Sequence, residues 1–276
     1  MIPCHFINLD GEKDRCDFMQ GQFARFNRHE QLARFAAKDF RLGIPDGAAE
    51  KYSPHQGGPY WQLSKGEVGC FESHMALWRK CAQGDTPALV ILEDDVLLSL
   101  QMPDILDKLS DAADGFDVLH MDGAVANFRL GPQFELAGLA VRDVRATCPS
   151  AACYAVSKIG AQKLVARAEA GYCDHADDFV NSPGPNFRVL QLEPAVAIQT
   201  MWATRPDLGV VTSALQPTTA TKSKRNKGPW AYRTRKKLRQ SGQRLVRLLG
   251  GDARLLKSGG IIGKPVLADD LPQYRD

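Results

Sequence analysis

The segment 87-PALVILEDDVLLS-99 places three acidic residues directly behind a run of apolar ones. Residues 88–92 predict a buried strand, because the run is short, partly β-branched and preceded by turn-forming residues. Glu93, Asp94 and Asp95 then lie where this strand leaves the sheet. Adjacent negative charges at the rim of a core are unfavourable unless something positive compensates them, so we expect a ligand or an ion to bind there.

The composition is that of an ordinary globular protein. A chain of 276 residues is long enough for one large domain, or for one domain with an appendage. Its 44% apolar and 24% charged residues are usual values, and no apolar run approaches the length of a membrane span. The first ten residues have no basic n-region, so we expect no secretory signal. Seven cysteines without a C-x-x-C pair predict reduced structural thiols of a cytosolic protein, in preference to disulfides or a zinc site.

Strand-like and helix-like segments alternate along the body of the chain. This alternation predicts an α/β fold with a mostly parallel sheet covered by helices on both faces. Ligands of such sheets collect at the carboxyl ends of the strands, and 7-INLD-10 and 93-EDD-95 both lie at such ends. The predicted strands are 2–8, 88–92, 117–121, 151–156 and 188–192, and the predicted helices are 14–36, 64–83, 103–113 and 157–170.

The charge is unevenly distributed along the chain. Residues 1–221 hold 20 Lys and Arg against 28 Asp and Glu, whereas residues 222–257 hold 13 Lys and Arg against the single acid Asp252. We therefore predict a boundary near residue 221, between a body of residues 1–221 and a basic, partly helical C-terminal extension of residues 222–276.

The basic extension contains the pattern of an amphipathic helix. Leucines at 238, 245, 248 and 249 form a narrow apolar stripe among many cations, and Trp230 and Tyr232 precede it. Such a helix is typical of proteins that lie on an anionic membrane surface. The alternative is a helix whose leucines pack on the body. Nucleic acid is not expected, because no base-reading motif accompanies the charge.

The clearest helix start is the sequence 64-SKGEVG-69. Ser64 and Glu67 have the spacing of a capping box. Gly66 and Gly69 are poor helix formers. They are either simply tolerated in the first turn, or they let a ligand or another backbone approach closely.

Four motifs occur in a fixed order: 6-FINLDGEKDR-15, 66-GEVGCFESHMALW-78, 88-ALVILEDDV-96 and 153-CYAVSKIGAQKLV-165. In order and spacing they resemble those of glycosyltransferase family 25, the lipopolysaccharide-type β-galactosyltransferases of bacteria. The resemblance covers about residues 2–210. It implies a GT-A type nucleotide-binding fold, a UDP-sugar donor, a glycan or glycolipid acceptor, and a divalent metal held at an acidic D-x-D-like motif.

The resemblance identifies residues 93–95 as that acidic motif. Side chains alternate along a strand, so Glu93 and Asp95 can face one way while Asp94 faces the other. We assign Asp95 and Glu93 to the metal, which is usually Mn²⁺ in this family, with Mg²⁺ as the second choice. Asp94 is then left for the ribose or the donor sugar. The alternative is an acidic strand end that caps a helix or pairs with an arginine.

The same resemblance suggests which residues contact the nucleotide-sugar. Asn8 and Asp10 follow the first strand and can form hydrogen bonds to uracil or ribose. Glu67, Ser73 and His74 are the candidates on the helix. Ser73 and His74 are adjacent, so we expect at most one of them to touch the donor. A lone histidine on an apolar helix face is more often a core residue.

Transfer from an α-linked donor to a β-linkage requires inversion, and hence a carboxylate that takes the proton of the acceptor hydroxyl. Asp177 and Asp178 are the main candidates, in a stretch that only loosely fits the family pattern. Asp174 is a further candidate. Asp122 also competes, although an Asp-Gly pair equally indicates a turn.

Two other classes of function remain open. One is a metal-dependent phosphatase or phosphotransferase, although 93-EDDVLL-98 lacks the usual threonine. The other is a non-enzymatic scaffold whose basic extension binds lipid or nucleic acid. For the transferase we expect a location in the cytoplasm, peripherally on the inner face of the cytoplasmic membrane.

Overall fold

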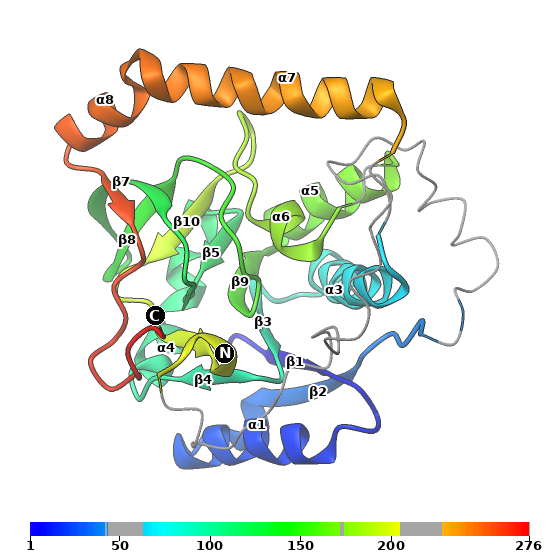
Figure 1. Ribbon diagram of the computed structural model, residues 1–276. Coiled ribbons are helices and arrows are strands. Elements are labelled where there is room, and N and C mark those ends of the chain that lie inside the picture. The colour runs from blue at the N-terminus through cyan, green and yellow to red at the C-terminus, as the bar shows by residue number, and fades with distance from the viewer. Residues whose placement is uncertain (42, 44–62, 172–173, 205–227, 276) are drawn as a thin grey trace.

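The computed structural model describes residues 1–41, 43, 63–171, 174–204 and 228–275 (Figure 1). Within these residues nine strands form one sheet, in the order β12-β7-β8-β10-β5-β9-β3-β1-β2. The strands are β1 Cys4–Asn8, β2 Leu32–Ala36, β3 Ala88–Glu93, β5 Val118–His120, β7 Phe128–Leu136, β8 Leu139–Val144, β9 Cys153–Ser157, β10 Val189–Leu192 and β12 Ile261–Gly263.

Most strands of this sheet run in the same direction. Six of them (β2, β1, β3, β5, β10 and β7) point one way, and β9, β8 and β12 point the other. The sheet is therefore mixed. Because β9 and β8 are inserted between strands of the majority direction, many neighbouring strands pair antiparallel.

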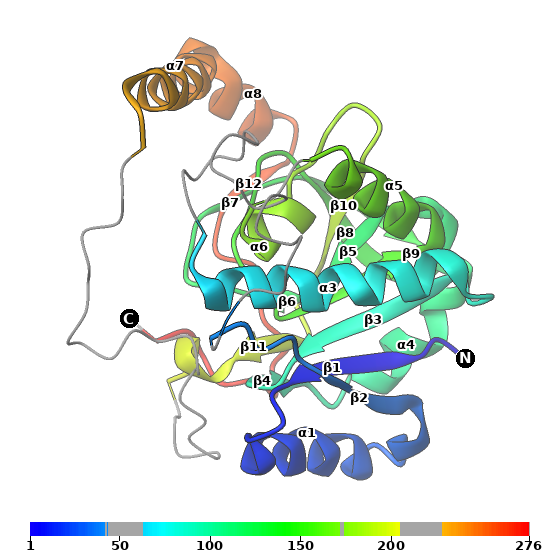
Figure 2. The ribbon, with the colours of Figure 1, turned by 90° about the vertical axis from the view of Figure 1, so that its right-hand side faces the viewer.

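Strand β3 separates two hydrophobic cores. Its side chains alternate, so Val90 and Leu92 belong to one core and Leu89 and Ile91 belong to the other. Helices cover both faces, as predicted: α1 and α4 lie on one side, and α3, α5 and α6 lie on the other (Figure 2). The helices are α1 Lys13–Arg25, α3 Lys65–Gln83, α4 Met102–Ala112, α5 Lys158–Glu169 and α6 Ala176–Val180.

A small second sheet lies where β3 and β5 end. Its strands are β4 Val96–Leu98, β11 Ala197–Gln199 and β6 Asp122–Gly123, with β11 in the middle. Strand β4 follows β3 after the two-residue turn Asp94–Asp95, and β6 follows β5 closely. Strand β11 therefore brings its own side chains to the acidic end of β3.

The basic extension is partly helical, as predicted, and its end returns to the body. Helix α7 (Trp230–Val246) lies at the periphery in both ribbon views (Figures 1 and 2), and α8 (Asp252–Lys257) follows it. Strand β12 then pairs with β7, and Ala268 and Leu271 join a third small core on β4 and β11. The boundary predicted near residue 221 lies outside the described residues. No helix in the described ranges is both long and apolar enough to cross a membrane.

One predicted element is wrong over much of its length. The helix predicted over residues 14–36 ends with α1 at Arg25, and β2 follows at Leu32. Asn27 has a φ of 53°, a left-handed conformation that interrupts a helix and that asparagine tolerates better than most residues. The next residues bind along β1 as a parallel edge strand. The long hairpin of β7 and β8 was also missed.

The start of α3 agrees with the sequence. The Ser64 side chain accepts the N–H of Glu67, and the Glu67 carboxylate accepts the N–H of Ser64, which completes the capping box. A methyl group on Gly69 would collide with the backbone carbonyl oxygen of Lys38. Of the two explanations for Gly69, close approach of another backbone is therefore the correct one.

This contact predicts opposite effects for two helical glycines. Gly69→Ala should lower the thermal unfolding midpoint, because the added methyl group pushes residues 37–39 away from α3. Gly21→Ala is the control, since a Cβ at Gly21 of α1 meets no atom within 4 Å. That change should be neutral or stabilise by about 0.5–1 kcal/mol. Equal effects of the two substitutions in a thermal unfolding experiment would show that the contact at Gly69 is unimportant.

Candidate active site

The middle acid of the turn after β3 is fixed by two partners. The side-chain amide of Asn8, at the end of β1, donates to Asp94 Oδ2 at 2.7 Å. Arg15, a buried residue of α1, donates to Asp94 Oδ1 at 3.0 Å. The ends of β1 and β3 therefore meet over one site, as the sequence suggested. The charge of Asp94 is compensated within the protein.

The other two acids share an amide on β11. Gln199 Nε2 donates to Glu93 Oε2 at 2.8 Å and lies 3.3 Å from Asp95 Oδ1. The indole N–H of Trp202 donates to Gln199 Oε1 at 3.1 Å, which directs the amide nitrogen toward the acids. Glu93 and Asp95 therefore share Gln199 as a partner, whereas Asp94 has other partners. Because Asp94 and Asp95 form a turn, this separation comes from the turn and not from the strand alternation that was expected.

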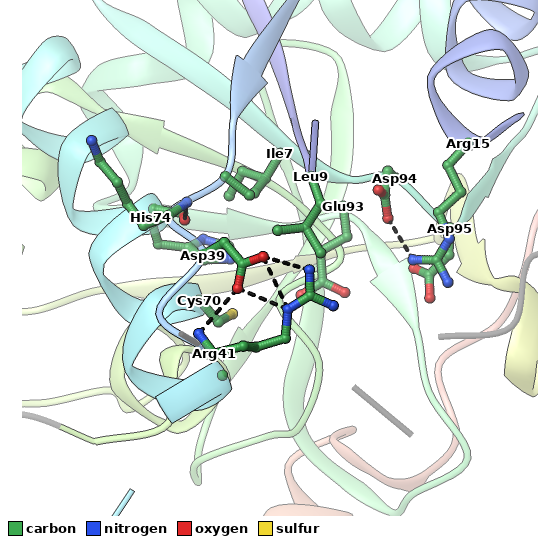
Figure 3. A pocket seen from close by; sticks show the side chains of 14 residues that line it. Ile7, Leu9, Arg15, Asp39, Arg41, Cys70, His74, Glu93, Asp94 and Asp95 are labelled. Atoms are coloured by element: carbon green, nitrogen blue, oxygen red, sulfur yellow. Dashed lines mark hydrogen bonds and ion pairs between the residues drawn. The ribbon is translucent and has the colours of Figure 1, made fainter. Parts of the chain in front are cut away.

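These acids lie at the floor of a cavity (Figure 3). Its walls come from the ends of β1 and β2 and from one face of α3. Three cationic side chains line it, on Arg15, Lys38 and Arg41, and Arg41 binds the carboxylate of Asp39. The remaining lining residues are Ile7, Leu9, Ala37, Asp39, Gly66, Cys70, Ser73, His74, Glu93, Asp94 and Asp95.

The electrostatics of the floor favour a cation. Burial, followed by the charge of Asp95, raises the pKa of Glu93 well above its usual value. Burial and the charge of Asp94 raise the pKa of Asp95 to about 6. Among the described residues no lysine or arginine forms an ion pair with Glu93 or Asp95. Two hard carboxylate donors on a common amide, neither of them ion-paired to a described lysine or arginine, fit a divalent cation that prefers oxygen ligands.

Ser73 and His74 both line the cavity, although the sequence suggested that at most one of them would face the ligand. The Ser73 hydroxyl donates to the carbonyl of Gly69 at 2.7 Å and accepts the N–H of Lys38 at 2.8 Å. It therefore holds the cavity wall formed by residues 37–39 against α3. Burial lowers the pKa of His74 to about 4, so its imidazole is neutral near pH 7.

Three predicted nucleotide contacts have other partners in the structure. Asn8 is buried, and its amide is used by Asp94, the carbonyl of Glu12 and the guanidinium of Arg34. The carboxylate of Asp10 binds Arg34 at 2.6 Å on the exposed side. Glu67 is used in the capping box and also lies 3.4 Å from His175. None of these three residues is among those that line the cavity.

The candidate bases differ in their placement. Asp177 on α6 is among the charges that raise the pKa of Glu93 and of Cys70. Asp174 is buried and accepts the N–H of His175. Asp122 is fully buried and accepts from the Ser150 hydroxyl and from the N–H of Cys153. Asp122 therefore acts as a structural acceptor, although its charge raises the pKa of Glu93 more than that of Asp177 does.

Sequence reasoning missed one wall of the cavity. Lys38, Asp39 and Arg41 follow β2, and β2 was predicted as the end of a helix. The segment 32-LARFA-36 shows no alternation of apolar and polar residues, so no local pattern marked this strand. The bridging role of Gln199 was also missed, because it depends on a contact between residues more than a hundred positions apart.

Comparisons with known proteins agree with the motifs. The profile of glycosyltransferase family 25, described as an LPS biosynthesis protein family, matches residues 1–180. The chain belongs to glycosyltransferase family 25. It is 27% identical over 176 residues to the lipooligosaccharide biosynthesis protein lex-1 of Haemophilus influenzae, which is 59% of this chain and 58% of that protein. It is also 54% identical over 37 residues to the lipooligosaccharide biosynthesis protein lic2B of the same species, which is 13% of this chain and 14% of that protein.

The match to these curated relatives is partial, since the chain spans less than two thirds of the length of either one. Among solved structures, mannose-1-phosphate geranyltransferase from Thermus thermophilus overlaps 69% of this chain and 73% of its own. The TM-score is 0.38 and the sequence identity 12%. An overlap of that quality supports no conclusion about this family 25 protein.

The raised pKa of Asp95 predicts how the stability of this family 25 protein depends on pH. An acid whose folded pKa is raised stabilises the fold at low pH, and this contribution is lost as the pH rises from 3.8 to about 6. In EDTA, the free energy of unfolding of the native protein should therefore decline through this range. Asp95→Asn should show a smaller decline and should be the more stable protein at pH 7.

Denaturant unfolding at a series of pH values measures this difference. Asp10→Asn is the matched control, because Asp10 is exposed and paired with Arg34, and its profile should follow that of the native protein. An unchanged profile for Asp95→Asn would contradict the assignment of buried, uncompensated charge to Asp95.

Proposed function

We propose that this family 25 protein transfers a hexose from a UDP-sugar to a hydroxyl of a lipopolysaccharide, a lipooligosaccharide or another glycan, with inversion, on a GT-A type fold. Galactose is the first choice of hexose, because the family resemblance implies it. Glucose is the second, because it differs from galactose by only one epimeric hydroxyl. The observation that carries the proposal is the pair Glu93 and Asp95 on one amide, in a cavity also lined by three cationic side chains. The two relatives are both lipooligosaccharide biosynthesis proteins, which supports the class of acceptor.

The cavity suits a nucleoside diphosphate chemically. Arg15, Lys38 and Arg41 offer positive charge to phosphate oxygens. Glu93 and Asp95 would hold a divalent metal, Mn²⁺ first and Mg²⁺ second, through oxygen donors. Bound there, such a cation supplies positive charge that stabilises the departing diphosphate. Arg15 stays fixed by Asp94, so its position is set before the donor binds.

The acceptor hydroxyl needs a base on the face opposite the leaving group. We assign this role to Asp177 and keep Asp178 as the second candidate. The support is electrostatic, because Asp177 is among the charges that raise the pKa of Glu93. Asp122 has a larger effect on Glu93, and its carboxylate is already engaged by Ser150 and Cys153. Proton removal from the hydroxyl by this carboxylate would accompany attack on the anomeric carbon.

Membership of family 25 weighs against the two other classes of function. Phosphatases and phosphotransferases of the alternative class usually carry their nucleophilic aspartate in a motif with a threonine, which 93-EDDVLL-98 lacks. A scaffold would have no use for the uncompensated acids in the cavity. Glycosyl transfer accounts for both the acids and the cations.

The proposed reaction predicts that removing the metal and removing the base each lower turnover, and the two effects can be measured separately. UDP-galactose turnover should require Mn²⁺ or Mg²⁺ and stop in EDTA. Asp177→Asn should lower turnover by roughly 10² to 10⁴ with UDP affinity nearly unchanged, because a base acts on the acceptor. Asp178→Asn is the control and should lose much less.

Calorimetry measures the affinity for UDP, and a coupled assay for released UDP measures turnover. Full turnover in EDTA would rule out the metal. A collapse of UDP affinity in Asp177→Asn would move that residue from the base role to the donor site or to the fold.

The basic helix α7 supports a second part of the proposal, contact with an anionic membrane. Trp230, Leu238 and Leu245 are between 55% and 76% exposed, so these side chains are not packed on the body. This argues against the alternative of a helix docked by its leucines. Arg233, Arg235, Lys236 and Lys237 lie on the same helix. Apolar side chains among cations suit the surface of anionic lipid on the inner face of the cytoplasmic membrane, where a lipid-linked acceptor would be embedded.

Point variants test this contact better than truncation, because cutting near residue 221 would also remove β12 from the sheet. A Leu238→Ser, Leu245→Ser double variant should bind anionic vesicles roughly tenfold or more weakly, since it loses apolar burial in the interface. Ile159→Ser is the control, an exposed apolar residue of α5 on the body. Co-sedimentation measures the difference. Equal binding of the double variant and the native protein would exclude α7 as the contact.

A further inference from the structure

Cys70 and His74 are four residues apart on α3, so their side chains lie on one face of the helix. The end of β3 places Glu93 opposite that face. One ligand atom from each of these three residues, a thiol sulfur, an imidazole nitrogen and a carboxylate oxygen, lies within 4.8 Å of the other two. Figure 3 shows Cys70, His74 and Glu93 around the same part of the cavity. A helix and a strand, both packed in the core, hold the three side chains.

One nitrogen of the buried imidazole is left without a partner. His74 is 0% exposed. Its Nδ1 lies 2.9 Å from the hydroxyl of Tyr154, which also accepts the indole N–H of Trp78 at 2.8 Å. Its Nε2 is buried and has no hydrogen-bond partner among the described residues. Buried polar atoms are almost always satisfied, so this nitrogen points to a ligand that completes it.

The Tyr154 hydroxyl can serve either tautomer of His74, by donating to Nδ1 or by accepting from it. When it accepts, the lone pair of the ring is on Nε2 and is available to a metal. Metal-binding histidines commonly donate their second N–H to an oxygen in this way. The contact with Tyr154 also fixes the plane of the ring.

We propose that Cys70, His74 and Glu93 form a binding site for a thiophilic divalent cation of the zinc class. Sulfur, imidazole nitrogen and carboxylate together are a ligand set of zinc, and three protein ligands leave a fourth position open. Mn²⁺ and Mg²⁺ prefer oxygen ligands and are matched by Glu93 and Asp95 instead. The two sites share Glu93, so they cannot both be filled with full ligand sets.

The shared Glu93 links zinc binding to the transfer reaction, and this link rests on the proposed function. Zinc at the three-residue site takes Glu93 away from Asp95 and occupies the floor of the cavity. Zinc therefore inhibits the Mn²⁺-dependent transfer reaction. The zinc site itself does not depend on what the enzyme transfers.

Titration of the full-length, metal-free protein with Co²⁺ tests the site without an activity assay. Cobalt bound to Cys70 should give a cobalt–thiolate charge-transfer band that saturates at one equivalent, and Zn²⁺ should abolish the band. Cys70→Ser should lose it. His74→Gln should weaken cobalt binding by at least about 10- to 100-fold, because that much affinity is lost when only the hydrogen-bond partner of a metal ligand is removed. Cys16→Ser is the control, a partly exposed cysteine of α1, and should keep the band.

The cobalt titration of the native protein is sufficient to overturn the proposal, so the test stays decisive even if a variant fails to fold. No charge-transfer band in the native protein would exclude the site. A band that persists in Cys70→Ser would place cobalt elsewhere. Unchanged cobalt affinity in His74→Gln would mean that Nε2 carries a hydrogen and binds no metal. Failure of UDP-sugar turnover leaves all three readouts untouched, so the two proposals fail separately.

Discussion

The hydrogen bond between Asn8 and Asp94 joins the ends of β1 and β3, and the geometry of the cavity depends on it. Arg15 completes this junction from α1. With the middle acid held on one side, the short turn into β4 presents Glu93 and Asp95 to Gln199 on the other. The same three-residue acidic sequence therefore performs two tasks. One acid fastens the core together, and two acids remain for a ligand.

The two free acids are kept in place at a cost to the fold. Burial disfavours their ionised forms, and the raised pKa values of Glu93 and Asp95 express that cost. Gln199 offsets part of it with an amide dipole and does not remove the need for a cation. An arginine in its place would stabilise the protein and would compete with a metal. Because residue 199 is a neutral glutamine, Glu93 and Asp95 remain available to bind a cation.

Local patterns were readable from the sequence, and so was the meeting of the ends of β1 and β3, but the other contacts between distant segments were not. The buried run of β3 and the capping box of α3 were predicted, because each depends on residues close in the chain. Strand β2 was mistaken for helix, and with it the wall containing Lys38 and Arg41 was lost. The basic composition of the extension identified α7. The three residues of β12 are too few to show a strand pattern, so the return of the chain to the sheet could not be predicted.

The returning segment supports the acidic pair from behind. The N–H of Arg275 donates to the carbonyl of Trp202, and Trp202 in turn orients Gln199. Asp270 accepts from the Ser99 hydroxyl and from the N–H of Leu100, close to where β4 ends. The indole that orients Gln199 is thus held by a segment far along the chain from the acids. Proteolytic removal of the residues after β12 would therefore loosen the support of Glu93 and Asp95 without touching either acid.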